Sequence, residues 1–212
     1  MISVKTFVFN PFRENTYLLV DDTKECVIID PGCYEPAEKK ILKDYIEKNG
    51  FLPKLLLNTH CHLDHIFGNN FIRDTYGIDL CAHKGELPVL QLALQTGEIY
   101  GTPFREAPSN PDVLLEDGQI LKFGQSELRC IHAPGHSPGS ICYYSAADGI
   151  LFSGDVLFHS SIGRTDLPGG DYDTLINSIR SKLLILDDDI KVYPGHEMTT
   201  SIGHERSTNP FL

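Results

Sequence analysis

Three histidines and an aspartate lie within six residues of this chain, shortly after the largely apolar residues 54–57. A strand at residues 54–57 would hold the backbone rigid there, and side chains two apart on an extended chain point to the same side. His60 and His62 are therefore expected to face one position, and the turn into a following helix can bring Asp64 and His65 to a second one. Imidazole and carboxylate are ligands that zinc and similar divalent ions prefer. The HxHxDH spacing therefore predicts a metal site rather than loop histidines that only form hydrogen bonds.

Three later positions repeat this arrangement with one polar residue each. His136, Asp155 and His196 each follow an apolar, strand-like segment, and each is preceded by a glycine. Glycine lets the chain turn sharply and removes the Cβ that would crowd a ligand. Four polar clusters at the ends of successive strands predict one convergent site at one sheet edge.

Hydrophobic periodicity predicts a mixed order of helices and strands. The expected helices are residues 36–50, 66–76, 86–96 and 171–184. The expected strands are residues 4–9, 16–20, 26–29, 54–57, 78–82, 113–115, 119–121, 127–131, 140–144, 150–152 and 190–193. Neither a parallel α/β pattern nor an all-β pattern fits this order. It predicts an α+β fold in which two mixed sheets pack together with helices outside, as a single domain over residues 1–212.

Composition limits which classes of binding partner and which cellular compartment we expect for this protein. Acidic residues outnumber basic ones, 29 against 18, so the net charge is −11. Binding of nucleic acid needs clustered Lys and Arg, and no such cluster is present, so we expect no nucleic-acid partner. We find neither a signal peptide nor an apolar run long enough to span a membrane. The six cysteines form no CxxC pair, which is typical of free thiols in a reducing compartment, so we expect a cytoplasmic protein. The oligomeric state is left open.

HxHxDH followed by GH, GD and GH in this order resembles the metallo-β-lactamase superfamily, and the match extends over the whole chain. The resemblance implies a four-layer αββα sandwich with two divalent ions at one edge of the sheets. The implied ligands are His60, His62 and His136 for one ion, Asp64, His65 and His196 for the other, and Asp155 as the bridge. Asp64 and Asp155 are expected to act in catalysis as well. Zinc is the expected metal, and iron and manganese suit the same ligands.

The charge of such a centre favours an anionic substrate. Five neutral histidines and two carboxylates carry a charge of −2, and two divalent ions carry +4. A bridging hydroxide would leave the centre near +1, which favours an anionic small molecule and an oxyanion intermediate.

Within the superfamily, the chain is most similar to the glyoxalase II-like (hydroxyacylglutathione hydrolase-like) enzymes. The segments that carry this likeness are residues 10–17 (NPFRENTY), 132–140 (HAPGHSPGS), 154–158 (GDVLF), 163–166 (GRTD) and 205–211 (ERSTNPF). The resemblance implies hydrolysis of a thioester such as S-lactoylglutathione by a bridging hydroxide, with a thiolate as leaving group. Long members carry a C-terminal helical domain that binds glutathione. We expect no such domain here, which leaves the acyl group and the thiol open.

Other activities occur on the same fold. A persulfide dioxygenase would use a single iron, on His60, His136 and Asp155, and those enzymes also resemble this chain at residues 163–166. The presence of all seven ligands favours hydrolysis. A hydrolase of lactones, β-lactams or other esters would share the metal site. The negative net charge argues against a nuclease, because binding of nucleic acid needs a basic surface.

The remaining candidates have weaker signals. Arg164 and His159 are candidates for substrate binding, although Arg164 equally suits a salt bridge to an aspartate and His159 a surface position. His132 is expected beside a ligand or in the core. Alternation turns Cys61 away from the metal, as a small buried thiol. The residues expected to be structural are His83 and His204, together with the core aromatics Phe7, Phe9, Phe12 and Tyr17.

Overall fold

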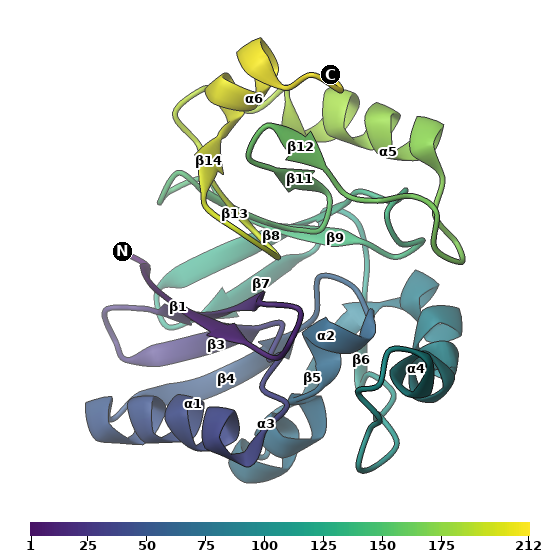
Figure 1. Ribbon diagram of the computed structural model, residues 1–212. Helices are drawn as coiled ribbons and strands as arrows, with labels where there is room; N and C mark the ends of the chain where they lie inside the picture. Colours follow the sequence, from purple (N-terminus) through teal and green to yellow (C-terminus); the bar gives the residue numbers. More distant parts are fainter.

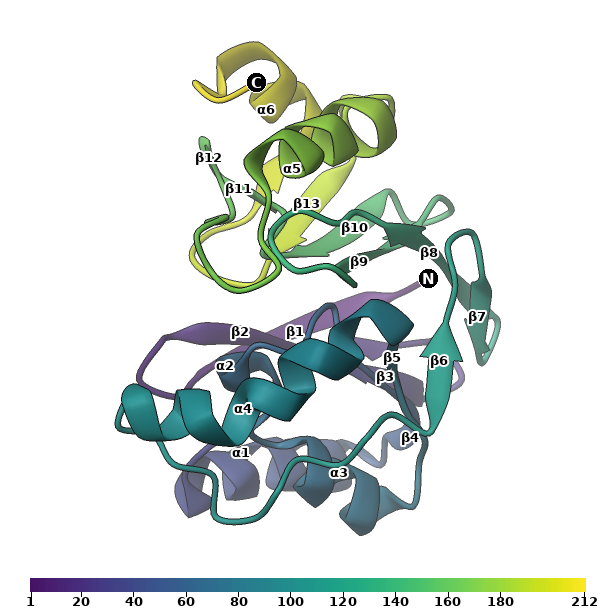
Figure 2. The ribbon, with the colours of Figure 1, turned by 90° about the vertical axis from the view of Figure 1, so that its right-hand side faces the viewer.

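The computed structural model covers residues 1–212 and shows two six-stranded sheets packed face to face (Figure 1). Helices cover both outer sides, and Figure 2 shows the layers from the side. α1 (Pro36–Asn49) and α3 (Asn69–Tyr76) lie outside the first sheet. α5 (Tyr172–Ser178) and α6 (Ile202–Thr208) lie outside the second. The predicted α+β architecture of four layers is therefore confirmed.

The first sheet is built from the N-terminal half of the chain and is mixed. Its strands in spatial order are β1 (Ser3–Phe9), β2 (Glu14–Val20), β3 (Glu25–Ile29), β4 (Leu52–Leu57), β5 (Leu80–His83) and β6 (Val113–Leu115). β1, β2 and β3 are antiparallel, and β3 to β6 are parallel. Because β3 and β4 run in the same direction, they end at the same edge, where Asp30 and Asn58 follow them.

The second sheet is mainly antiparallel. Its strands in spatial order are β14 (Thr200–Ser201), β13 (Lys191–Pro194), β10 (Ile150–Gly154), β9 (Ile141–Ser145), β8 (Ser126–His132) and β7 (Ile120–Phe123). β10 and β13 are the parallel pair. They therefore end at one edge, directly before Asp155 and His196. A short hairpin of β11 (Leu157–Phe158) and β12 (Ser161–Ile162) continues from β10.

Apolar side chains from both sheets form the central core. A cluster of 16 buried residues joins the inner faces, and Leu19, Leu57 and Phe152 in it are fully buried. Separate clusters lie under the helices, where Leu42 of α1 and Leu175 of α5 are also fully buried. Burying each such side chain contributes about 1.5–3 kcal/mol. The sandwich is thus held together at three apolar interfaces, and its edges are left for polar residues.

The first predicted helix is confirmed, and the second is divided. α1 begins at Pro36, and Gly50 ends it with φ 64°. The helix expected at residues 66–76 is instead α2 (Leu63–Ile66) followed by α3. Gly68 separates them because its backbone packs against the loop after β3. Its N–H donates to Pro31 O at 2.7 Å, and a Cβ there would lie 2.4 Å from Cys33 Sγ.

The later helices also differ in extent from the predictions. α4 (Leu87–Ile99) runs past the expected end at residue 96, and the helix expected to reach residue 184 turns into a π-helical segment, η2 (Ile179–Leu183). β11, β12, β14 and α6 were not predicted. These strands have two residues each, which is too short for an alternating pattern. None of the helices has the length and apolar character needed to cross a bilayer.

Candidate metal centre

Loops from both sheets meet at one edge of the sandwich and bring together all seven residues expected at a metal site. The loop after β4 carries His60 and His62, and α2 carries Asp64 and His65. The second sheet supplies the other three after β8, β10 and β13, namely His136, Asp155 and His196. Two triads can be formed from these residues, and within each triad the ligand atoms lie within 4.8 Å of one another.

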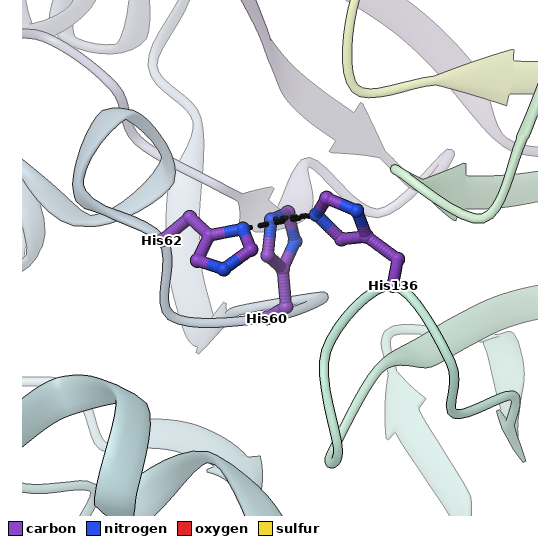
Figure 3. Close-up of side chains that lie close together, drawn as sticks. All are labelled: His60, His62 and His136. Atoms are coloured by element: carbon purple, nitrogen blue, oxygen red, sulfur yellow. Dashed lines mark hydrogen bonds between the residues drawn. The ribbon is translucent and has the colours of Figure 1, made fainter. Parts of the chain in front are cut away.

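The first triad is His60, His62 and His136, whose rings point toward one another in Figure 3. His136 Nε2 lies 2.9 Å from His62 Nδ1 and 3.2 Å from His60 Nε2. A neutral imidazole carries a single N–H, so three converging nitrogens cannot all be satisfied by one another. Burial lowers the pKa of His62 to about 3 and that of His60 well below its usual range, which keeps both rings neutral. Their lone pairs therefore suit a cation.

The second triad is Asp64, His65 and His196. Asp64 Oδ2 lies 3.2 Å from His196 Nε2 and 3.7 Å from His65 Nε2. The carboxylate of Asp155 lies between the two triads. Its Oδ1 is 3.5 Å from His65 Nε2, and its Oδ2 is 3.6 Å from both His136 Nε2 and His196 Nε2. Asp155 is therefore placed to connect both groups.

Two buried atoms at this junction lack a hydrogen-bond partner, namely His65 Nε2 and Asp155 Oδ1. Leaving buried polar atoms unpaired costs about 1–3 kcal/mol each. Burial opposes ionisation of Asp155, but the neighbouring His65 and His196 hold the pKa of this carboxyl well below its usual range. Burial opposes a charge on His65 as well, but Asp64, Asp155 and Asp30 raise its pKa well above the usual range. A divalent ion would take the place of the imidazole proton between these carboxylates, so the residues fit the metal that the sequence predicted.

The opposite nitrogen of four of these rings is anchored, which directs Nε2 toward the centre. The anchors are Thr59 Oγ1 for His60 (3.1 Å), Asp30 Oδ2 for His65 (3.1 Å), Arg164 O for His136 (2.8 Å) and Phe12 O for His196 (3.2 Å). Such outer hydrogen bonds fix the tautomer and the orientation of a metal-binding imidazole. The rings are thus oriented by the protein itself.

Asp30 is a functional residue that the sequence analysis missed. It is buried, and besides contacting His65 it accepts hydrogen bonds from Thr59 N (2.7 Å) and Thr59 Oγ1 (2.6 Å). It adopts φ 48°, a left-handed conformation that is rare outside glycine. The available signal is a carboxylate that directly follows the predicted strand 26–29 and precedes Pro31-Gly32.

Glu86 is the second missed residue and joins two ligand loops. It is 1% exposed, at the start of α4. Its Oε2 accepts from Cys61 N at 2.7 Å, and its Oε1 accepts from Ser137 Oγ and Gly139 N, both at 2.6 Å. Burial raises the pKa of Glu86, and these three donors act against that rise. No local pattern marks this residue, because its partners are remote in sequence.

A cavity of about 430 Å³ opens over the metal-ligand cluster. Phe12, expected in the core, lines it instead, because residues 10–13 form the turn between β1 and β2. Arg164 also lines it and forms two hydrogen bonds of 2.7 Å with Asp166, so its salt bridge is confirmed and its contact with a substrate stays a prediction. His159 does not line the cavity. Its ring stacks on His204, with centroids 4.7 Å apart.

The remaining candidate residues from the sequence lie in the core or outside the ligand cluster. The ring of His132 stacks on that of His83 with centroids 4.1 Å apart, and its Nε2 donates to Pro138 O, outside the ligand cluster. Phe7, Phe9 and Tyr17 are buried in the core, as expected. Cys61 is 2% exposed, and burial raises the pKa of its thiol well above the usual range. All six cysteines are buried and unpaired.

Comparisons with known proteins agree with this architecture. A family model described as "Metallo-beta-lactamase superfamily" matches residues 9–196. The chain is 37% identical to "Hydroxyacylglutathione hydrolase GloC" of Haemophilus influenzae, over 100% of this chain and 98% of that protein. It is similar to the solved structure of the BLEG-1 B3 metallo-beta-lactamase, with a TM-score of 0.90, 39% identity and 99% of both chains covered. TTHA1623, solved in a di-iron-bound form, gives a TM-score of 0.88 at 35% identity, over 98% of this chain and 100% of that chain. This chain belongs to the metallo-β-lactamase superfamily of metallo-hydrolases.

Proposed function

We propose that this protein hydrolyses thioesters at a centre of two divalent ions. The observation that carries the proposal is the position of Asp155. Its Oδ2 lies 3.6 Å from a nitrogen of each triad, His136 Nε2 and His196 Nε2, and its Oδ1 lies 3.5 Å from His65 Nε2 of the second. A single-ion site would need only one triad. The second triad and the unpartnered buried Oδ1 of Asp155 are accounted for when both positions are filled.

The roles follow from the geometry of the residues. His60, His62 and His136 would hold one ion, and Asp64, His65 and His196 the other, with Asp155 shared. Bound there, the ions would supply a Lewis acid and a water molecule of lowered pKa. Asp64 and Asp155 line the cavity floor, where their carboxylates can hold a proton from the attacking water. Arg164 lines the wall of the cavity, where its guanidinium is paired with Asp166.

The thioester assignment is supported by a relative of matching length. The protein named hydroxyacylglutathione hydrolase is covered over 98% of its length by this chain, so the two sequences match over almost their full lengths. We accordingly propose that residues 1–212 form a single domain. Zinc is the proposed metal, and the di-iron-bound form of TTHA1623 supports iron as the alternative. The six unpaired cysteines support a reducing, cytoplasmic location.

A β-lactam hydrolase is the second candidate, because the BLEG-1 structure bears that name at 39% identity. Lactones and other esters would meet the same centre. These substrates share attack at an acyl carbon and differ in the leaving group. The choice between them therefore depends on direct comparison of substrates.

The test is an assay of zinc-loaded protein with S-lactoylglutathione, following thiol release and metal content. We expect turnover that His62→Ala and Asp64→Ala each reduce by more than roughly a hundredfold, since loss of an outer-shell partner alone typically costs 10–100-fold. His204→Ala should retain wild-type activity, because His204 lies outside the ligand cluster and stacks on His159.

A negative result in this assay is interpreted from the metal content and from two other substrates. No turnover with two ions bound would exclude glutathione thioesters, and hydrolysis of a chromogenic cephalosporin would then favour the second candidate. Oxygen uptake with glutathione persulfide at one iron per chain would instead indicate a dioxygenase.

A further inference from the structure

The cavity has one mainly apolar wall, which comes from α4 and the residue after it. The lining residues are Val89, Leu92, Ala93 and Thr96 of α4, together with Tyr100 at its C-terminal end. Spacings of three and four residues place these side chains on one face of the helix. With a rise of 1.5 Å per residue, the stripe from Val89 to Tyr100 is about 16 Å long. The wall is therefore long enough for an extended substrate arm.

Most of the lining outside α4 and the ligand cluster is apolar too. It includes Phe12, Phe158, Leu167 and Pro168. Arg164 is the one cationic side chain of the lining apart from the histidines of the ligand cluster, and its guanidinium is already paired with Asp166. Glutathione carries two carboxylates and an ammonium group, and placing unpaired charges against apolar surface is costly. This lining is poorly matched to such a thiol.

The apolar wall is also incompletely covered by the protein itself. Leu92 is 41% exposed and Tyr100 is 47% exposed, although both line the cavity. Covering apolar surface of this kind gains about 25 cal/mol per Å². An apolar substrate arm would provide that cover, since the side chains stand over the reacting centre.

We propose that the site takes acyl thioesters whose apolar acyl chain lies along the α4 stripe from Val89 to Tyr100. This inference rests on the proposed thioesterase function and specifies its substrate class. In the reaction, the oxygen of water bonds to the acyl carbon and the C–S bond breaks. The products are a carboxylic acid, which loses its proton at neutral pH, and the free thiol. The apolar chain stays on α4 while the thiol leaves through the mouth of the cavity.

The test is a series of straight-chain thioesters of N-acetylcysteamine, from acetyl to octanoyl, with the zinc-loaded full chain. The thiol is small, neutral and constant, so only the acyl chain varies. We expect kcat/KM to rise about fourfold for each added methylene, the factor expected when a CH₂ group leaves water. Octanoyl thioesters should also be used better than S-lactoylglutathione.

Matched variants locate the effect on α4. Leu92→Gln should lower kcat/KM for the octanoyl thioester by roughly tenfold, which corresponds to one lost apolar contact, and leave the acetyl thioester nearly unchanged. Leu94→Gln is the control, since Leu94 is similarly exposed (47%) on the same helix but lies outside the cavity lining. Thr96→Phe, which fills the stripe, should move the optimum to shorter chains.

The outcomes separate this inference from the proposed function. If acetyl and octanoyl thioesters are hydrolysed equally well, or Leu92→Gln and Leu94→Gln behave alike, the acyl-chain assignment is wrong and the thioesterase stands. If S-lactoylglutathione is the better substrate by kcat/KM, the lining selects a polar thiol and the assignment is again wrong. If the zinc-loaded protein hydrolyses no thioester at all, both proposals fail.

Discussion

Glu86 is a buried carboxylate whose hydrogen bonds all go to loops that carry expected metal ligands. It accepts from Cys61 N, between two ligands, and from Ser137 and Gly139, next to His136. Replacing Glu86 with Gln keeps the shape but puts an NH₂ group where an N–H or O–H must be accepted. Each buried group left unpaired costs about 1–3 kcal/mol.

We therefore expect Glu86→Gln to weaken metal binding and activity by roughly 10–100-fold, the usual effect of losing an outer-shell partner. Metal affinity, measured by competition with a chromogenic chelator, is the readout that separates this from a purely structural loss. Glu98→Gln is the control, because Glu98 is exposed on the same helix. Unchanged metal affinity in Glu86→Gln would show that the two loops hold their positions without it.

At the scale of elements, the turn before His136 is tightly packed against the start of α5. Gly135 has φ 130°, and a Cβ there would lie 2.2 Å from Leu175 N. Asp171 N donates to Gly135 O at 2.8 Å, so the helix start and the ligand loop are fixed together. Any side chain at Gly135 must displace α5 or the loop.

Gly135→Ala should therefore destabilise the protein by several kcal/mol and displace His136, with loss of metal and of activity. Gly118→Ala is the matched comparison, since Gly118 also has positive φ (78°) but its Cβ would meet nothing within 4 Å. It should cost only the backbone strain of about 1–2 kcal/mol and leave activity intact. Urea unfolding with metal analysis measures both effects. Equal costs in the two variants would disprove the packing argument.

The sequence predicted the architecture and the ligand cluster to different degrees, for physical reasons. His60 and His136 could be found because ligands at strand ends have local signals, namely strand periodicity and a following turn or preceding glycine. Glu86 could not, since its role arises only when α4 packs against loops 25 and about 50 residues away. The break between α2 and α3 at Gly68 could not be predicted for the same reason, because it depends on contact with Pro31, which is remote in sequence. Phe12 was misplaced because an aromatic residue in a turn has no periodicity to show which way it faces.

For the whole molecule, the expected ligands connect the two sheets. His60 and His65 belong to the first sheet's side, and His136, Asp155 and His196 to the second. Ions bound at both positions would therefore stabilise the sandwich itself, by an amount set by affinity and free metal. At a thousandfold excess over Kd, each site contributes about 4 kcal/mol.

Chelation should then lower Tm by roughly 10 °C or more, given about 2–4 °C per kcal/mol for a protein of this size. Differential scanning calorimetry before and after zinc is restored measures this. Asp155→Ala, which removes the residue between the triads, should abolish most of the metal-dependent increase. A Tm that does not respond to chelation would mean that the sheets pack equally well without metal.

The division of the ligands between the two sheets also sets when a metal centre can be completed during synthesis. The loop with His60 and His65 is made first, and about 130 further residues are needed to reach His196. At 5–20 residues per second, this takes roughly 7–26 s. Throughout that interval the nascent chain presents an incomplete ligand set. Binding of metal by all seven expected ligands is therefore possible only once β13 has joined the second sheet.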